Sequence, residues 1–167
     1  MNLNPIEVRV ATAADRLPLF RMLELYQHDL SDIWDQELDV HGEYGYELDR
    51  YWRQANCHPF VALVNGHYAG FALVDGSVKV AGSGHWMDQF FVLKKYRRSG
   101  LGKAMALRVF SQLPGYWEVG QMPDNTPAQA FWRAVIADLT DGAYTEQILT
   151  TGWWQGIVQC FGSDSGT

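Results

Sequence analysis

The sequence is poor in cysteine and has no long apolar run. Its two cysteines, Cys57 and Cys160, lie far apart and form neither a metal-binding nor a redox motif. No apolar run approaches the roughly 20 residues that cross a bilayer, and the first ten residues show no basic segment followed by an apolar one. We therefore expect a chain without disulfides that works in the reducing cytoplasm and away from membranes.

Basic residues are outnumbered as well. The chain has 13 Lys and Arg against 19 Asp and Glu, and its net charge of −6 argues against general nucleic-acid binding. Its five histidines are scattered without metal-ligand spacing, and no G-x-S-x-G nucleophile motif is present. We expect no metal and no nucleic-acid partner.

A length of 167 residues suits one domain that is large enough for a sizeable core. We expect this single domain to span residues 1–161. Residues 162–167 are small and polar, and we expect them to form a short disordered tail.

The most informative stretch runs from Met87 to Phe110. Residues 87–93 contain a continuous apolar run and predict a buried strand, residues 94–102 predict a turn, and an apolar pattern from about 101 to 113 predicts a helix. Pro114 and Gly115 end that helix. The stretch therefore predicts a strand, a turn and a helix in direct succession.

The turn has the composition of a phosphate site. Gly100 and Gly102 let a ligand approach the main chain at the start of a helix, where the exposed N–H groups attract anions. Five of the 13 basic residues fall within ten positions here: Lys94, Lys95, Arg97, Arg98 and Lys103. We infer a diphosphate site; the alternative is a solvated basic turn that caps an ordinary helix.

The glycine spacing separates three kinds of phosphate site. A nucleoside triphosphate loop requires Ser or Thr after Gly102-Lys103, where this chain has Ala104, and a dinucleotide loop requires glycine where it has Met105. The remaining pattern, Arg97-x-x-Gly100-x-Gly102, resembles the pyrophosphate loop of the GNAT superfamily of N-acetyltransferases. The apolar strand before the loop and the helix after it strengthen this resemblance.

The resemblance implies an α/β (α+β) fold with a mixed, mostly antiparallel central sheet, flanking helices and a splayed strand pair for acyl-CoA. The residues predict matching elements along nearly the whole chain. Apolar and alternating segments predict strands, the dipeptide Asn65-Gly66 predicts a hairpin, and capping signals predict helix starts. The further expected strands are residues 6–11, 60–64, 68–74, 116–119, 143–149 and 153–161. We expect one further helix to begin between residues 12 and 15, a second to span residues 46–56, and a third to begin at residue 126.

The resemblance also implies acetyl-CoA as cosubstrate. The strand main chain would pair with the pantetheine arm, the turn would hold the pyrophosphate, and an asparagine and an aromatic residue near the last helix match the family pattern. The cofactor-binding residues implied in this way are Phe90, Phe91, Val92, Arg97, Arg98, Ser99, Gly100, Leu101, Gly102, Lys103, Asn125 and Phe131. Plain core packing is the alternative for Phe90 and Val92.

The implied chemistry is direct attack of a primary amine on the thioester. Glu118 and Asp88 are the candidate bases, each with a solvent-facing strand carboxylate as the alternative, and a water chain would also serve. The family often protonates the leaving thiolate with a tyrosine, but this chain has Trp132 at that position. Tyr144 and Tyr116 are possible substitutes.

The acceptor is less constrained. The segment 31–45 is acidic and aromatic, and it is either a solvated loop or a lid that attracts a cation; Asp32, Trp34 and Asp35 are its candidate substrate-binding residues. A small cationic amine is our first expectation. A protein or peptide N-acetyltransferase and a non-catalytic CoA-binding regulatory module are the alternatives, and a homodimer built on Trp153-Trp154 stays open.

Overall fold

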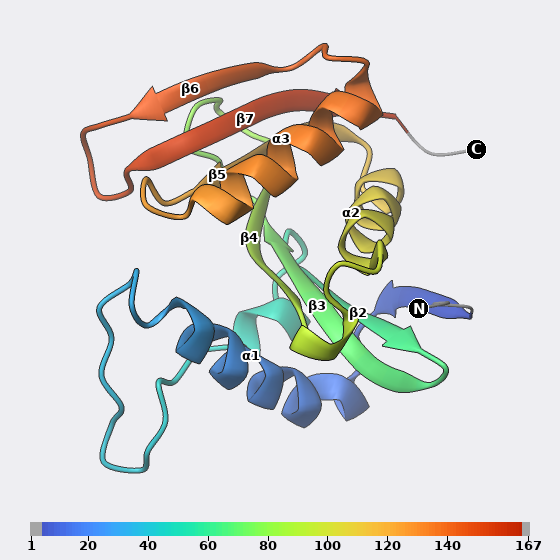
Figure 1. The fold of residues 1–167 in the computed structure, drawn as a ribbon, viewed down its shortest axis with the longest axis vertical. Helices are drawn as coiled ribbons and strands as arrows, with labels where there is room; N and C mark the ends of the chain where they lie inside the picture. Colours follow the sequence, from blue (N-terminus) through green and yellow to red (C-terminus); the bar gives the residue numbers. More distant parts are fainter. Residues whose placement is uncertain (1–4, 165–167) are drawn as a thin grey trace. The chain divides into compact units, whose positions relative to one another are not determined.

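The computed structural model describes residues 5–164 and divides the chain into two compact units. The first unit comprises Met1–Leu73 and Gln89–Gly102, and the second comprises Val74–Asp88 and Lys103–Thr167. Within the described residues, seven strands form one hydrogen-bonded sheet in the order β1-β2-β3-β4-β5-β7-β6. The sheet is mixed and mostly antiparallel and is accompanied by three α-helices, which confirms the predicted fold class (Figure 1).

In the first unit, a helix packs on the apolar face of the strands. The elements are β1 (Ile6–Val10), α1 (Arg16–Leu30), β2 (His58–Val64), most of β3 (His67–Asp75) and the end of β4 (His85–Val92). β1 runs antiparallel to β2. The buried core joins residues of α1 to residues of β2, β3 and β4, namely Leu19, Met22 and Leu23 with Val61, Phe71, Leu73 and Phe91.

The start of α1 is fixed by one buried carboxylate. Asp15 ends the short 3-10 helix η1 (Ala13–Asp15) and accepts the Thr12 N–H at 2.7 Å. It also accepts two hydrogen bonds from Arg9 of β1, at 2.6 and 3.0 Å, and one from the Tyr68 hydroxyl of β3 at 2.5 Å. The Arg9 guanidinium, followed by Tyr68 and Thr12, holds the pKa of Asp15 well below its usual range. These contacts link two strands to the beginning of the helix.

The Asn65-Gly66 hairpin is confirmed, whereas the helix predicted over 46–56 is wrong. Asn65 and Gly66 have φ of 51° and 79°, as a tight two-residue turn between β2 and β3 requires. Residues 46–56 contain only the single-turn 3-10 helix η2 (Asp49–Trp52). Leu48, Tyr51 and Cys57 are all buried in the core of this unit, and the chain enters β2 at His58, so the segment follows the core rather than a longer helix.

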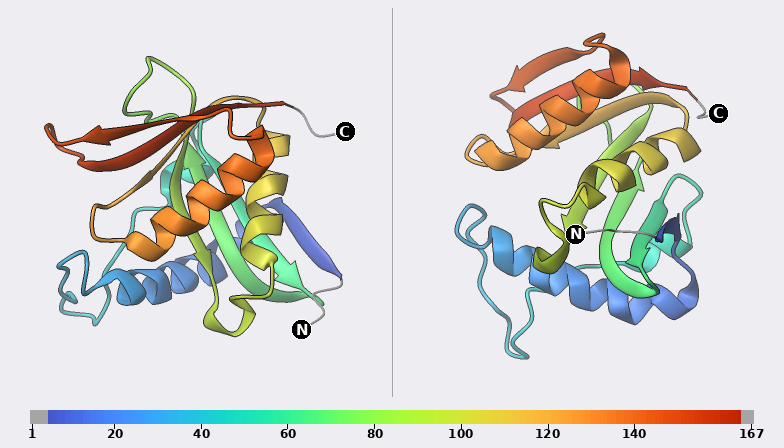
Figure 2. Two further views of the ribbon diagram at one scale, coloured as in Figure 1. Left: turned by 45° about the horizontal axis from the view of Figure 1, so that its top comes forward. Right: turned by 45° about the vertical axis from the view of Figure 1, so that its right-hand side comes forward.

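In the second unit, α3 (Thr126–Thr140) lies along the antiparallel strands β5 (Gly115–Gln121) and β7 (Gly156–Ser163), with β6 (Thr145–Leu149) paired to the outer side of β7 (Figure 2). The helix start predicted at Thr126, with Pro127 in its first turn, is confirmed, but the cap is Asn125, whose side chain accepts the Ala128 N–H, rather than Thr126. Four large rings fill the core: the ring of Phe110, on α2 (Leu101–Gln112), lies 4.8 Å from that of Trp117, 5.1 Å from Phe161 and 6.1 Å from Trp132.

The tail predicted from Gly162 onward is wrong for its first two residues. Gly162 and Ser163 belong to β7 and pair with Tyr116 and Gly115 of β5. The buried Ser163 hydroxyl donates to the Phe110 carbonyl at 2.9 Å, so side-chain hydrogen bonding offsets the lack of apolar bulk. Residues 165–167 of the predicted tail lie outside the described residues. Among the helices of residues 5–164, none is both long enough and apolar enough to span a membrane.

Candidate functional site

The glycine-containing turn has the backbone of an anion site. After the 3-10 helix η3 (Lys94–Tyr96) the chain passes through positive φ at Arg98 (60°) and Gly100 (88°) and enters the twelve-residue helix α2. Positive φ next to ordinary φ curls successive N–H groups toward one point, and the start of a helix adds its partial positive charge. A side chain at Gly100 would meet nothing within 4 Å, so the space above the turn is open.

The basic side chains of the turn are not equivalent. Arg97 donates to the Val92 carbonyl at 2.9 Å, pairs with Asp29 of α1, and places its guanidinium 5.4 Å from the Phe91 ring. It therefore braces the turn against the rest of the first unit. Arg98 is exposed and follows directly. Local sequence patterns could not reveal the bracing role of Arg97, because its partner Asp29 lies 68 residues away.

Lys103, in the second unit, also has an acidic partner. Its ammonium pairs with Asp138 of α3. Both groups are about half exposed, so the pair is solvent-screened and weakly held. A phosphate oxygen could replace Asp138 at low cost, and the prediction that Lys103 contacts the cofactor stays a prediction.

The side chains at the end of β4 lie on two different faces. The Phe91 side chain is buried and lies against Tyr26 and Phe71, with ring centroids 5.5 and 5.7 Å away. Phe90 and Val92 are half-buried and point to the opposite face, because strand side chains alternate. Gly70 of β3 makes room for the Phe91 carbonyl, since a Cβ there would lie 2.4 Å from that oxygen.

Glu118, the first candidate base, is fully buried in the second unit and already saturated with donors. Its two carboxylate oxygens accept the backbone N–H groups of three consecutive residues, at 2.5 Å for Lys79, 3.0 and 3.1 Å for Val80 and 2.8 Å for Ala81. The Tyr116 hydroxyl donates to the same carboxylate at 2.8 Å. This environment favours a structural carboxylate that holds the loop after β3 over a base that receives protons from a substrate.

The other candidates for proton transfer lie in different settings. Asp88 is half-buried on β4, and its charge acts on Lys79 together with the charges of Asp75 and Glu118. Tyr144 is half-buried in the turn between α3 and β6. Burial, followed by hydrogen bonds to Cys160 and Glu118, raises the pKa of Tyr116, which makes that hydroxyl a poor proton donor.

Asn125 stands at the start of α3, and Phe131 lies within that helix. The Asn125 side chain accepts the Ala128 N–H at 3.4 Å and so acts as the helix cap. Phe131 is half-buried and meets the ring of Trp132 edge-on, 5.0 Å between centroids. Trp132 is itself buried against Phe110, so the indole at the position of the family's usual tyrosine is a core residue.

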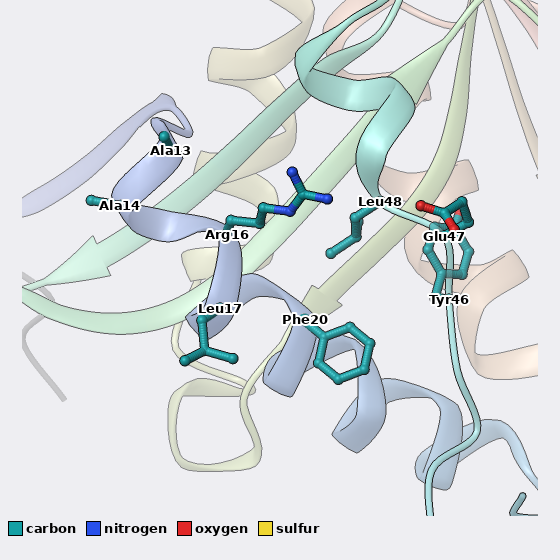
Figure 3. A pocket seen from close by; sticks show the side chains of 8 residues that line it. All are labelled: Ala13, Ala14, Arg16, Leu17, Phe20, Tyr46, Glu47 and Leu48. Carbon is teal, nitrogen blue, oxygen red and sulfur yellow. The ribbon is translucent and has the colours of Figure 1, made fainter.

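The predicted acceptor residues are exposed. Asp32, Trp34 and Asp35 lie in the turn that follows α1. They do not line the pocket of about 460 Å³ that the first unit contains (Figure 3). That pocket, which we did not predict because we expected Tyr46 and Glu47 in a helix, is lined by Ala13, Ala14, Arg16, Leu17, Phe20, Tyr46, Glu47 and Leu48.

The pocket joins aromatic rings to charged groups. Phe20 comes from α1, and Tyr46 with Glu47 comes from the irregular segment that follows it (Figure 3). Arg16 pairs with Asp49, and its guanidinium lies 5.5 Å from the Trp52 ring, so its charge is already compensated. Glu47 is exposed and gives the pocket a carboxylate beside two rings. Within residues 5–164, no cluster of three or more His, Cys, Asp or Glu side chains suits a metal ion.

Comparisons with known proteins agree on one family. The chain matches the model of the acetyltransferase (GNAT) family over residues 19–135. No match was found among curated protein sequences. Solved structures share the fold at low identity. An acetyltransferase from Thermus thermophilus superimposes with a TM-score of 0.70 at 14% identity, covering 97% of this chain and 99% of its own.

The names of two further proteins of known structure state what those proteins acetylate. An aminoglycoside acetyltransferase solved with coenzyme A has a TM-score of 0.65 at 16% identity, with 94% of each chain covered. A ribosomal-protein alanine N-acetyltransferase from Escherichia coli has a TM-score of 0.61 at 14% identity, covering 97% of this chain and 96% of its own. At such identity these likenesses establish the fold and leave the acceptor open.

Proposed function

We propose that this chain, which belongs to the GNAT family of acetyltransferases, transfers an acetyl group from acetyl-CoA to a primary amine of a small cationic molecule. Family membership makes it an N-acetyltransferase with acetyl-CoA as donor. The acceptor, and the residues that bind the cofactor and transfer protons, are our proposals.

The cofactor would be held first by its diphosphate. In this proposal the main-chain N–H groups between Arg98 and Lys103 bind the two phosphates, and the exposed Arg98 adds charge. Arg97, which is bound to Asp29 and to the Val92 carbonyl, keeps the turn in its curled shape. The pantetheine arm would pair with the main chain of Phe90–Val92, as an added strand does.

One observation carries the acceptor proposal. Residues 31–49 contain seven Asp and Glu and no Lys or Arg, and they include Trp34, Tyr44 and Tyr46. Carboxylates mixed with aromatic rings attract ammonium groups through charge and through the electron-rich ring faces. The pocket beside Phe20, Tyr46 and Glu47 offers the same combination. A fold neighbour that acts on aminoglycosides, which are cationic amines, supports this choice.

The chemistry requires a proton acceptor and a proton donor. The amine nitrogen attacks the thioester carbon, a C–N bond forms, the C–S bond breaks, and the amine loses a proton while the thiolate gains one. We propose Asp88, directly or through water, as the acceptor, because the oxygens of Glu118 already accept main-chain N–H groups. Tyr144 is our candidate for protonating the thiolate. The main chain near Phe91 would steady the developing oxyanion.

Two alternatives to this proposal each have one supporting observation. The Escherichia coli neighbour acts on a ribosomal-protein alanine, which supports a protein N-terminus as acceptor. Trp132 in place of the family's usual tyrosine supports a CoA-binding module without catalysis.

We also propose a cytoplasmic location, which agrees with two buried cysteines, neither of which forms a disulfide.

Thiol release from acetyl-CoA with a panel of acceptors tests the proposal. We expect turnover with polyamines or aminoglycosides and weaker turnover with amino acids and peptides. Turnover with peptides alone would replace the small acceptor by a protein one. Binding of acetyl-CoA by calorimetry, with no turnover across the panel, would identify the non-catalytic module.

A further inference from the structure

The loop between β3 and β4 presents one lysine to two tryptophan rings in the second unit. The Lys79 Nζ lies 3.8 Å from the centroid of the Trp86 ring and 5.1 Å from that of Trp153. The same ammonium donates to the Ser77 carbonyl and, at 3.3 Å, to the Ser77 hydroxyl. Two ring faces and two oxygens thus surround one primary ammonium; we call these groups of Ser77, Trp86 and Trp153 the ammonium cage.

The Trp86 wall of the cage is held in place by packing. Trp86 is 4% exposed and stands edge-on to Trp154 at 5.3 Å. Gly120 makes room for both rings, since a Cβ there would lie 2.4 Å from Trp86 and 2.7 Å from Trp154. The floor of the cage is therefore formed before any cation enters it.

The loop that carries Lys79 is held separately. Glu118 accepts the N–H groups of residues 79–81, and the buried Asp75 accepts the N–H and hydroxyl of Ser77 at 2.9 and 2.6 Å. These bonds fix the main chain and do not involve the Lys79 side chain. Removal of that side chain should therefore leave the loop, and Ser77 with it, in place.

Three carboxylates act on the cage, which is partly buried and has an open side. Partial burial lowers the pKa of Lys79, and the negative charges of Asp75, Asp88 and Glu118 offset part of that effect by favouring the ammonium form. The other wall, Trp153, is 86% exposed, so the cage has an open side. A cation from solution can reach the position that Lys79 occupies once that side chain moves.

We infer that the ammonium cage is a binding site for a primary alkylammonium group and that Lys79 fills it as an internal ligand. The two rings recognise the cation, and the two Ser77 oxygens require N–H donors, so the site favours a primary ammonium over a quaternary one. Lys79 competes with the ligand from a short tether, which raises its effective concentration and leaves the site closed to weak ligands. This inference concerns binding alone and is independent of which amine the enzyme acetylates.

The variant Lys79→Ala opens the cage, and Lys79→Met keeps it filled with an uncharged chain of similar length. In a titration followed by tryptophan fluorescence, n-butylammonium should bind Lys79→Ala roughly tenfold or more tightly than it binds Lys79→Met or the unaltered protein. Tetramethylammonium and n-butanol should bind Lys79→Ala more weakly than n-butylammonium, and adding Trp153→Ala to Lys79→Ala should weaken n-butylammonium binding.

Equal, weak binding of n-butylammonium to folded Lys79→Ala and Lys79→Met would overturn the inference, with circular dichroism used to confirm folding. If Lys79→Ala does not fold, proton NMR of the unaltered protein decides. The Lys79 ε-methylene protons should be shifted upfield by the Trp86 ring, and n-butylammonium at high concentration should return them toward the value of a solvated lysine. No change at saturating ligand would equally overturn it. Acetyl transfer has no part in either readout, so failure here and failure of the proposed function are separable.

Discussion

Glu118 receives the Val80 N–H with both of its carboxylate oxygens, at 3.0 and 3.1 Å. The two neighbouring N–H groups, of Lys79 and Ala81, complete a shallow cup around one buried negative charge. The loop binds this carboxylate much as an anion-binding turn binds a ligand. Glu118, which we predicted as a candidate base, therefore also holds the loop that carries Lys79 in place.

The first prediction concerns this fastening. Glu118→Gln replaces one acceptor oxygen by an NH₂ group that faces N–H donors, so it should lower the free energy of unfolding by about 2 to 4 kcal/mol. Thermal and urea unfolding measure the loss. Glu7→Gln, at an exposed position, is the control and should change little. A normal unfolding transition combined with a large fall in kcat that recovers at high pH would instead restore Glu118 as the base.

The second prediction concerns the turn before α2. Gly100→Asp adds a negative charge where we place phosphate and strains a position with φ of 88°, so CoA affinity should fall by roughly tenfold to 100-fold. Calorimetric titration with CoA measures this. Gly100→Asn has a similar shape, tolerates positive φ better and lacks the charge, so most of its affinity should remain. If Gly100→Asp and the unaltered protein bound CoA with the same affinity, the phosphates of CoA would not bind at this turn.

Much of the fold could be predicted because its signals are local. Asn65-Gly66 specifies a hairpin, and Thr126-Pro127 specifies a helix start, each within a few residues. The helix over 46–56 failed because burial of Leu48 and Tyr51, a long-range effect, outweighed helical spacing. The pocket beside Phe20 went unpredicted for the same reason, since Tyr46 and Glu47 reach it only through that irregular path.

In the candidate site, too, the features with local sequence signals could be predicted and those that depend on distant residues could not. The glycine pattern and the apolar strand are contiguous in sequence, so the turn and its helix could be placed in advance. The roles of Arg97 and Glu118 could not, because their partners lie 68 and 37 to 39 residues away. No pattern in the neighbouring residues marks Arg97 as a brace or Glu118 as a loop fastening. Such pairings depend on tertiary packing, which brings distant segments together.

The third prediction is a pH dependence at the start of α1. The Arg9 guanidinium lowers the folded-state pKa of Asp15 below its unfolded value, which is near 3.9. The stabilisation from Asp15 is therefore fully present above about pH 4 and is lost as the pH falls toward the folded-state pKa. Asp15→Asn should lower stability by about 2 to 3 kcal/mol at pH 7 and flatten the dependence of stability on pH below 4. Urea unfolding from pH 2 to 7 measures both effects.

The control for Asp15 is the exposed Asp164, whose substitution by Asn removes the same charge without a buried partner. Asp164→Asn should retain the acid dependence of the unaltered protein. If Asp15→Asn and Asp164→Asn gave the same curve, the network of Arg9, Asp15 and Tyr68 would contribute nothing measurable to the stability of the fold.

The fourth prediction tests the acidic turn after α1 as an electrostatic guide for the acceptor. Asp32 and Asp35 are exposed, so each attracts a cation only through screened charge. Changing both to Asn should raise KM for a polyamine about two- to tenfold, leave CoA affinity unchanged, and reduce the rise of KM with added salt. A control that changes Asp124 and Asp164 to Asn removes the same net charge from other exposed positions, so it separates local attraction from the overall field. If both double variants raise KM equally, the acidic turn has no special part in acceptor binding, and recognition must then depend on groups that contact the amine directly.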